Sequence, residues 1–272
     1  MRDTTTESKS NRAGNSPPGT ALSQIRELER QNAELREVVS VAGHDLRQPL
    51  RNLRACAERF ARSQAAHLDG EARELLSGLL MGARKTEQLI EDLLTYSRVL
   101  AGPLKLQRVD LNETLNWALQ MVCDQVEQQR ARVTHDVLPV VRADPARMIQ
   151  LFQNLVTNAL IYRGDEAARV HVAARSGPGE WIVSVRDQGI GVASRDWERI
   201  FEPFHRLHPE ERYPGTGLGL AICRKIVERH GGKIWMEPSP ERGATLVFTL
   251  PTRTATGTGG SRDAEPEPGG SA

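Results

Sequence analysis

The sequence has few aromatic residues, few cysteines and no long apolar run, and each scarcity excludes a class of protein. Phe, Trp and Tyr make up 4% of the 272 residues, which favours a helix-rich core over a sandwich of aromatic strands. The widely separated Cys56, Cys123 and Cys223 are odd in number, so no disulfide framework is expected and a reducing compartment fits. No stretch is apolar for the roughly 20 residues that a membrane-spanning helix needs, and no apolar leader follows Met1. We therefore expect a cytoplasmic protein, or a piece of a longer one, without a membrane span.

Neither sign of charge dominates the sequence. There are 36 Lys and Arg residues and 35 Asp and Glu residues, which gives a net charge of +1. A nucleic-acid-binding domain usually carries a basic surplus, so we expect no nucleic-acid partner. The apolar fraction of 39% is typical of a globular protein.

Composition divides the chain into four segments. Residues 1–20 are rich in Ser, Thr, Asn, Gly and Pro, and residues 252–272 in Gly, Thr, Pro and Glu, so both ends are expected to be disordered. Between them, residues 21–102 have helical periodicity, and residues 103–251 mix helical and strand-like runs. The sequence therefore predicts an α+β protein with a helical domain followed by a mixed domain.

Apolar residues of the first helical segment recur in alternating steps of three and four. This a/d heptad pattern, sustained through three repeats, is typical of a coiled coil. Asn32 takes an a position, where a buried amide pair fixes a parallel two-stranded register. One long amphipathic helix packed within a monomer is the alternative, but the regular period and the asparagine favour a homodimer. The seam comprises Ile25, Leu28, Asn32, Leu35, Val39, Ala42 and Leu46.

A second helix is predicted after a short loop. The first helix continues past Pro49, which must kink it or be absorbed at a bend, and it fades between Ser63 and Gly70. The second helix ends at Gly102-Pro103. Two such helical hairpins in a dimer would form a four-helix bundle.

Residues 103–251 are expected to form a sheet with helices on one face. Asp110 or Asn112 caps a helix predicted over 111–129, and Asp144 caps another that extends to Tyr162, with Pro145 at its first position. A third predicted helix, 219–230, stops at a Gly-Gly pair. Strands are predicted over 132–137, 140–142, 169–174, 181–186, 233–236 and 245–250.

His44 is the first chemical candidate. The heptad register places it at an f position on the outer surface of the bundle, where an imidazole can attack a phosphoryl group. The carboxylate of Asp45 can orient the ring, raise its basicity or take its proton. Alone this support is weak, because His135-Asp136 repeats the dipeptide in a predicted strand and an isolated exposed histidine is usually just solvated.

Amide side chains form a stripe on the helix that ends at Tyr162. Gln150, Asn154 and Asn158 recur every four residues and so share one face. An amide oxygen is a ligand that Mg²⁺ accepts beside water and phosphate. Amides that simply face water are an equally good interpretation of this stripe by itself.

Two glycine-containing segments fit a nucleotide. Asp187 follows the strand predicted over 181–186 and can accept a hydrogen bond from an adenine amino group, while Gly189 and Gly191 let the backbone approach the base. A plain turn is the alternative. Gly215-Thr216-Gly217-Leu218-Gly219 opens a helix and offers backbone N–H groups to phosphate oxygens, or flexibility to a lid. Its context fits neither a dinucleotide fold nor a Walker loop.

These motifs, in this order and spacing, resemble the boxes of two-component histidine kinases over residues 35–250. H boxes of the form seen here also occur in kinases linked to phytochrome-type sensors, and a separate sensory protein is an expected partner. The segments are His44–Leu50 for the H box, Asn154–Asn158 for the N box, Asp187–Gly191 and Gly215–Gly219 for the two glycine boxes, and Phe201-Glu202-Pro203-Phe204 for the F box.

The resemblance implies a dimeric helical phosphotransfer domain followed by a Bergerat-type α/β sandwich that binds ATP and Mg²⁺. It implies that His44 accepts the phosphoryl group, that Asp45 is its general base, and that an aspartate of a response regulator receiver domain is the final acceptor. Further implied roles are Mg²⁺ ligands for Asn158 and Asn154, adenine contacts for Asp187 and Tyr162, a phosphate contact for Arg206, and the pocket and lid for Gly189, Gly191, Gly215, Thr216, Gly217, Leu218 and Gly219.

Two residues depart from the family pattern. Ile161 stands where the family commonly has Lys or Arg, which predicts one phosphate contact fewer and modest ATP affinity. Gln48 stands where many members have Thr or Asn, which leaves phosphatase activity open. The alternative function is a catalytically weak, ATP-binding dimeric signalling scaffold. A chaperone-type or mismatch-repair-type ATPase is disfavoured, because it has no use for the heptad helix.

Overall fold

The computed structural model describes residues 18–65, 67–209, 212–239 and 242–252. Within the first helix, the side chains of residues 18–22, 25, 29, 32, 36 and 40 are outside the description. Most of the two predicted disordered ends, and the side chains of Ile25 and Asn32, therefore lie outside the described residues. Contacts divide the chain into two compact units, which meet at the Ala83–Arg84 bond. The predicted domain limits, 21–102 and 103–251, stay predictions.

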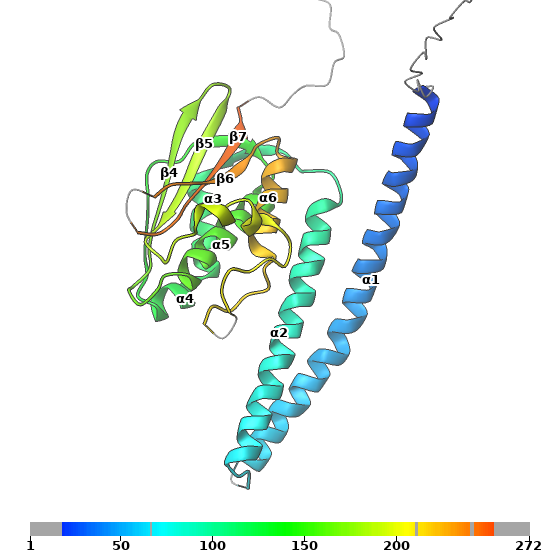
Figure 1. Cartoon of the computed structure of the whole chain (residues 1–272), viewed down its shortest axis with the longest axis vertical. Helices are drawn as coiled ribbons and strands as arrows, with labels where there is room; N and C mark the ends of the chain where they lie inside the picture. Colours follow the sequence, from blue (N-terminus) through cyan, green and yellow to red (C-terminus); the bar gives the residue numbers. More distant parts are fainter. Residues whose placement is uncertain (1–17, 66, 210–211, 240–241, 253–272) are drawn as a thin grey trace, which may run out of the picture. The chain divides into compact units, whose positions relative to one another are not determined.

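The first unit is a hairpin of two helices, as the sequence predicts (Figure 1). Helix α1 (Pro18–Gln64) begins three residues before the predicted start and runs through Pro49. Since proline has no N–H, the Asp45 carbonyl lacks its usual helical donor at this point. Helix α2 (Gly70–Leu100) begins where the Asp69 carboxylate accepts a hydrogen bond of 2.8 Å from the Ala72 N–H. The first half of α2, to Ala83, completes this unit.

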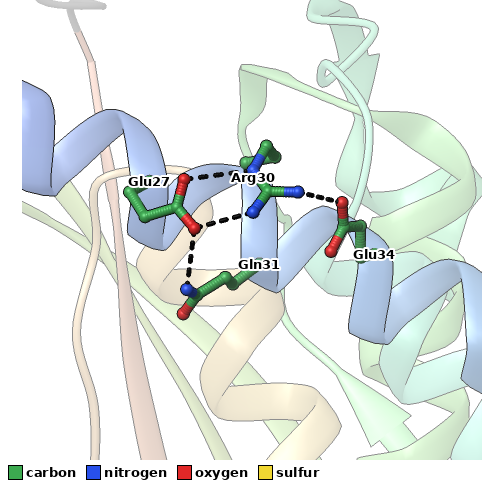
Figure 2. Close-up of polar contacts among 4 residues, drawn as sticks. All are labelled: Glu27, Arg30, Gln31 and Glu34. Carbon is green, nitrogen blue, oxygen red and sulfur yellow. Dashed lines mark hydrogen bonds and ion pairs between the residues drawn. The ribbon is translucent and has the colours of Figure 1, made fainter.

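The predicted seam of α1 is exposed in the single chain. Leu28, Leu35 and Leu46 are 58%, 65% and 57% exposed. On the same helix, Arg30 donates hydrogen bonds to the carboxylates of Glu27 and Glu34, and Gln31 donates to Glu27 (Figure 2). Pairs spaced by three or four residues stabilise a helix locally. These exposed pairs therefore contribute a small, local stabilisation to this part of α1.

The second unit is built on a five-stranded sheet with the order β2-β4-β5-β7-β6. The β2–β4 pair is parallel and the other neighbours are antiparallel. Helices α3, α5 and α6 cover one face, as predicted (Figure 1), and Phe152 of α5 meets Phe248 of β7 edge-on with ring centroids 6.1 Å apart. The strands are β2 (Arg132–His135), β4 (Arg169–Gly177), β5 (Glu180–Asp187), β6 (Ile234–Glu237) and β7 (Thr245–Pro251), and the long helices are α3 (Leu111–Met121), α5 (Pro145–Ile161) and α6 (Gly219–Arg229).

Two predictions for the start of this unit were wrong. β3 (Val140–Ala143) does not join the main sheet but pairs antiparallel with β1 (Gln107–Asp110), a strand that the sequence analysis missed. The predicted helix over 111–129 is broken at Val122 into α3 and α4 (Cys123–Gln128). Val122 leaves helical geometry with ψ near 15° and is 3% exposed, so the break accompanies the burial of this side chain.

Caps predicted from the sequence are in place. Asp110, rather than Asn112, caps α3 by accepting a hydrogen bond of 2.7 Å from the Asn112 N–H. Asp144 caps α5, accepting from the N–H groups of Ala146 and Arg147 through Oδ1 and from that of Lys105 through Oδ2. The bonds from Asn112, Ala146 and Arg147 satisfy donors that the first turn of a helix leaves without partners.

The end of α2 belongs to the second unit. Leu94 and Val99 are 3% and 1% exposed, and Val99 is part of the main core. The guanidinium of Arg229 donates to the carbonyls of Val99, Ala101 and Gly102, which the end of a helix leaves without partners. None of the described helices has both the length and the apolar composition needed to cross a bilayer.

Candidate active site

The second unit contains a cavity of about 630 Å³, a size typical of small-molecule sites. Its walls come from α2, α5, the start of α6, the end of β5 and the glycine-rich loop before α6. Two predicted cofactor contacts, Gly189 and Leu218, do not line it. The predicted residues that do are Asn154, Asn158, Tyr162, Asp187, Gly191, Arg206, Gly215, Thr216, Gly217 and Gly219.

Helix α5 presents the predicted amide stripe to the cavity. Gln150, Asn154 and Asn158 all line it. The Asn154 side-chain N–H donates a hydrogen bond of 3.2 Å to the Gly219 carbonyl. A Cβ added at Gly219 would lie 3.8 Å from Asn158 Oδ1, so both asparagines adjoin the start of α6. The N-terminal end of α6 and the amide stripe therefore form one wall.

Asp187 lies at the end of β5, where burial and hydrogen bonding act on it in opposite directions. Burial raises the pKa of this carboxyl, and hydrogen bonds from two backbone N–H groups counteract the rise. Those bonds come from Gly189 at 2.8 Å and Ala244 at 3.1 Å, and both end at Oδ1. The fixed Oδ1 orients the carboxylate and leaves Oδ2 for a donor such as an exocyclic amino group.

Gly189 does not line the cavity, and its role is to allow close backbone packing next to it. A Cβ at this position would lie 2.2 Å from the Tyr162 carbonyl oxygen, so only glycine fits without displacing the backbone. The same carbonyl accepts a hydrogen bond of 2.9 Å from the Ile190 N–H. Glycine here thus allows the loop after β5 to contact the end of α5 and holds Asp187 beside Tyr162.

The glycine-rich loop is fixed by backbone contacts with the F-box segment. The Phe204 N–H donates a hydrogen bond of 3.0 Å to the Gly217 carbonyl, and Phe204 itself has φ near 64°. Gly217 has φ near 77°, and a Cβ there would come within 2.8 Å of the Phe204 backbone. Leu218 is fully buried, so this predicted contact can reach a ligand only through its backbone.

Aromatic rings gather over one end of the cavity. Tyr162 and Tyr213 have ring centroids 5.2 Å apart, and His208 lies 6.1 Å from Tyr162 and 5.2 Å from Tyr213. Burial raises the pKa of the Tyr162 hydroxyl, and the charge of Arg206 opposes the rise. His208, which lines the cavity, and Tyr213, which packs against it, were not predicted from the sequence. The sequence signal that could have identified them is the presence of two ring-bearing side chains, His208 and Tyr213, shortly before the second glycine box.

Arg206, predicted to approach phosphates, is engaged with the loop backbone. Its guanidinium donates to the carbonyls of Tyr213, at 2.7 Å, and of Gly215. It also lines the cavity. In this structure Arg206 therefore shapes the loop, and a role at the phosphates would require it to exchange these acceptors for phosphate oxygens.

One wall of the cavity is formed by α2, and the sequence did not predict it. Gln88, Glu91, Asp92 and Thr95 line the cavity. The Thr216 hydroxyl, in the glycine-rich loop, donates a hydrogen bond of 2.5 Å to Asp92 Oδ2. No sequence motif joins residues 124 positions apart, and the helical pattern of α2 gave no reason to separate Asp92 from its neighbours.

The donor set fits a magnesium ion that is shared with a nucleotide. Among the described residues there is no group of three or more His, Cys, Asp or Glu side chains that could hold a metal by themselves. Because the Asn154 amide nitrogen donates to Gly219, its Oδ1 is the atom left for a cation. Mg²⁺ typically takes one or two protein oxygens and completes its shell with phosphates and water. Amide oxygens of Asn154 and Asn158 suit that arrangement.

His44 and Asp45 lie on α1, in the first unit. Their side chains are 79% and 73% exposed. The predicted a and d residues are also exposed in the single chain, so the f position of His44 stays a prediction. His44 Nδ1 lies 3.4 Å from Asp45 Oδ1, near the limit of a hydrogen bond. An exposed ring with one nitrogen directed at a carboxylate keeps the other nitrogen, Nε2, open to an electrophile.

Comparison with known sequences matches two family models to successive parts of the chain. Residues 34–102 match the family "His Kinase A (phospho-acceptor) domain", and residues 143–254 match "Histidine kinase-, DNA gyrase B-, and HSP90-like ATPase". The adaptive-response sensory kinase SasA of Synechococcus sp. (strain JA-2-3B'a(2-13)) is 32% identical over 255 residues, which cover 87% of this chain and 67% of SasA. The chain belongs to the two-component sensor histidine kinase family.

Other relatives are longer proteins. Cyanobacterial phytochrome A of Nostoc sp. (strain PCC 7120) is 40% identical over 231 residues, which cover 85% of this chain and 30% of the relative. The chain thus spans about a third of the length of the phytochrome relatives it matches.

Solved structures show the same fold. Full-length ShkA in complex with AMPPNP has a TM-score of 0.62 at 27% identity, covering 80% of this chain and 46% of ShkA. The complex of the histidine kinase ThkA with the response regulator TrrA has a TM-score of 0.58 at 25% identity, covering 84% of this chain and 66% of that one. A helical region followed by an α/β ATP-binding domain is therefore the fold of this chain, as predicted.

Proposed function

We propose that the protein is an ATP-dependent histidine kinase that phosphorylates its own His44. The observation that carries the proposal is the arrangement of Asp187: its Oδ1 is held by two backbone N–H groups, and its Oδ2 is left for a base amino group. This carboxylate shares a cavity with the amide stripe and the glycine-rich loop. A cavity with a base-recognition end and a phosphate-binding end supports nucleotide binding, and the exposed His44 supplies an acceptor.

The proposed reaction transfers the γ-phosphoryl group of ATP to a ring nitrogen. With the Nδ1–H of His44 directed at Asp45, Nε2 carries the lone pair and attacks γ-phosphorus. A P–N bond forms, the bond between γ-phosphorus and the bridging oxygen breaks, and ADP leaves. The Asp45 carboxylate stabilises the positive imidazolium that forms and can take the Nδ1 proton. Bound Mg²⁺, held by Asn154 and Asn158, would neutralise part of the phosphate charge.

Partners and location are part of the proposal. The phospho-acceptor family match and the exposed seam of α1 support a homodimer. ThkA, a structural relative, is seen in complex with a response regulator, which supports an aspartate of a receiver domain as the next phosphoryl acceptor. A separate sensory protein and a cytoplasmic location stay predictions.

One observation favours the alternative of a catalytically weak scaffold. Ile161 lines the cavity where a cationic side chain would contact phosphate. An aliphatic side chain offers phosphates neither charge nor a hydrogen bond, so ATP would bind less tightly. If affinity is too low for turnover, the protein would keep the dimer and the nucleotide site without the kinase activity.

Incubation with Mg-ATP labelled at the γ-phosphate tests the proposal. We expect label on the wild-type protein that is lost in acid and stable in alkali, as a phosphoramidate should be, and none on His44→Gln. His135→Gln is the matched control, because it removes a histidine that also precedes an aspartate, and it should label like wild type. Label that persists in His44→Gln would contradict the assignment, and a wild type that binds ATP without becoming labelled would favour the scaffold.

A further inference from the structure

The carboxylate of Asp92 reaches the glycine-rich loop from α2. Its Oδ2 accepts the hydrogen bond from the Thr216 hydroxyl at 2.5 Å, and its Oδ1 accepts one from the Gln88 side-chain amide at 2.8 Å. Both donors are neutral. Among the residues that the structure describes, the hydrogen bonds that orient this half-buried carboxylate thus come from neutral donors and not from a cation.

Asp92 occupies the end of the cavity that the proposed function gives to phosphates. Thr216 belongs to the loop whose backbone N–H groups are suited to phosphate oxygens. Its hydroxyl also accepts a hydrogen bond of 3.4 Å from the Leu218 N–H. The carboxylate therefore takes a donor that a phosphate oxygen would otherwise use, and it places a negative charge next to the expected path of the polyphosphate.

A fixed negative charge at this position acts differently on the two forms of ATP. Metal-free ATP carries more negative charge than its magnesium complex, so it is repelled more strongly. Partial burial strengthens the repulsion, because water screens a half-buried charge less than an exposed one. Mg²⁺ held by phosphates and amide oxygens would remove much of this penalty.

Resting on the proposed function, we propose that Asp92 is a specificity-determining residue that selects magnesium-bound ATP over metal-free ATP. The negative charge of its carboxylate repels the polyphosphate from the glycine-rich loop unless Mg²⁺ is bound to the phosphates. The role is one of exclusion and requires no bond between Asp92 and the metal.

Glu91 provides a matched control on the same helix. It lines the same cavity, but its carboxylate lies 3.9 Å from the guanidinium of Arg98, which balances its charge. Glu91→Gln removes one negative charge, as Asp92→Asn does, without touching the Thr216 contact. Asp92→Asn keeps the shape of the side chain and an oxygen that can accept the Thr216 hydrogen bond.

Calorimetric titration with three ligands tests the inference: ATP with excess Mg²⁺, ATP with EDTA, and adenosine. For Asp92→Asn we expect the Kd of metal-free ATP to fall about tenfold, because one adjacent like charge is removed. The Kd of Mg-ATP should fall less than about threefold, and adenosine should bind as it does to wild type. Glu91→Gln should leave the ratio of the two ATP affinities close to that of wild type. A second variant, Asp92→Ala, should change the ratio in the same direction.

Three results would overturn the inference, and they differ in what else they affect. An unchanged affinity ratio in Asp92→Asn, with Mg-ATP binding intact, overturns the inference alone. Weaker Mg-ATP binding by both Asp92 variants also overturns it, since the carboxylate would then act as a metal ligand or as a support of the loop. A wild-type protein that binds no Mg-ATP overturns the proposed function together with the inference.

Discussion

The two units of the chain treat their apolar side chains in opposite ways. Of the described apolar residues that are buried, all but Ala83 belong to the second unit, where one core joins the sheet to α3, α5 and α6. In the first unit, large apolar side chains such as Leu28, Leu35 and Phe60 are at least half exposed. Exposed apolar patches of this kind mark interaction surfaces.

The two units therefore differ in what stabilises them. The second unit carries its own core, so its fold follows from contacts within one chain. The first unit has local ion pairs, such as those of Arg30 with Glu27 and Glu34, and an apolar seam that only another surface can cover. The comparison teaches that the second unit buries its apolar residues within one chain, whereas the apolar residues of the histidine-bearing first unit are left for the proposed dimer to cover.

Disruption of the seam should have the largest effect. Leu28→Lys combined with Leu35→Lys is expected to weaken the dimer by on the order of 6 kcal/mol, since four leucines would leave the interface and four charges enter it. Light scattering should then report half of the wild-type mass. ATP affinity, a property of the second unit, should stay the same.

A control for this variant adds two lysines to outward-facing positions of the same helix. Ser23→Lys with Ala33→Lys occupies heptad positions f and b and should leave the mass unchanged. If the seam variant kept the wild-type mass, the a/d assignment would be wrong and the exposed leucines would need another explanation.

Replacing a phenylalanine by alanine should lower the free energy of unfolding more in the second unit than in the first, and this is the prediction with the second-largest effect. Phe152 is fully buried and contacts Phe248, so Phe152→Ala should lower the free energy of unfolding by about 3–5 kcal/mol. Phe60 is 52% exposed, and Phe60→Ala in a monomeric background should cost less than about 1 kcal/mol. Chemical denaturation measures both. A large cost for Phe60→Ala in the dimer alone would show that a partner covers this residue.

The sequence predicted the elements that depend on local chemistry. Asp144 followed by Pro145 marked the start of α5, and the a/d repeat marked α1, because a cap and a periodic apolar face act within a few residues. It did not predict β1, whose pairing with β3 depends on partners 30 to 36 residues away. Nor did it predict the break at Val122, where a buried residue leaves helical geometry within a continuous helical pattern.

The residues of the candidate site also divide into those that local sequence patterns predict and those that only the tertiary structure brings in. Asp187, Asn154 and Asn158 were found because each follows a recognisable pattern, and the structure places all three in one cavity. Asp92 and His208 were missed, since they enter the site through tertiary packing alone. Leu218 lies inside the glycine-rich motif, yet its side chain points into the core, so membership of a motif did not decide its contact.

The smallest expected effect concerns pH and compares two aspartates of the second unit. Burial raises the folded-state pKa of Asp187 above its unfolded value, so its ionisation destabilises the fold as the pH rises through that window. Asp187→Asn should therefore unfold at a higher temperature than wild type at neutral pH, and this gain should vanish below the usual range of an aspartate. The same variant should bind ATP about tenfold more weakly, because a hydrogen bond to a charged acceptor is lost.

Asp110 gives the opposite sign and serves as the control. Hydrogen bonds from Asn112 lower its folded-state pKa, so its contribution to stability is present above the unfolded pKa and lost as the pH falls through the folded one. Asp110→Asn should thus be less stable than wild type at neutral pH, and the difference should shrink in acid. Thermal unfolding across pH checks both variants, and equal ATP affinity of Asp187→Asn and wild type would refute the adenine contact.

Asp144 is hydrogen-bonded to three segments of the second unit. Its carboxylate binds the N–H groups that start α5 and the N–H of Lys105 in the linker after α2, while its own N–H donates to His230 Nε2 beyond α6. Burial lowers the pKa of His230, which keeps this nitrogen a neutral acceptor. The linker after α2 and the first turn of α5 therefore share one carboxylate, the linker through Oδ2 and the helix through Oδ1. A substitution at Asp144 would therefore act on the linker after α2 and on the helix that carries Asn154 and Asn158 at the same time.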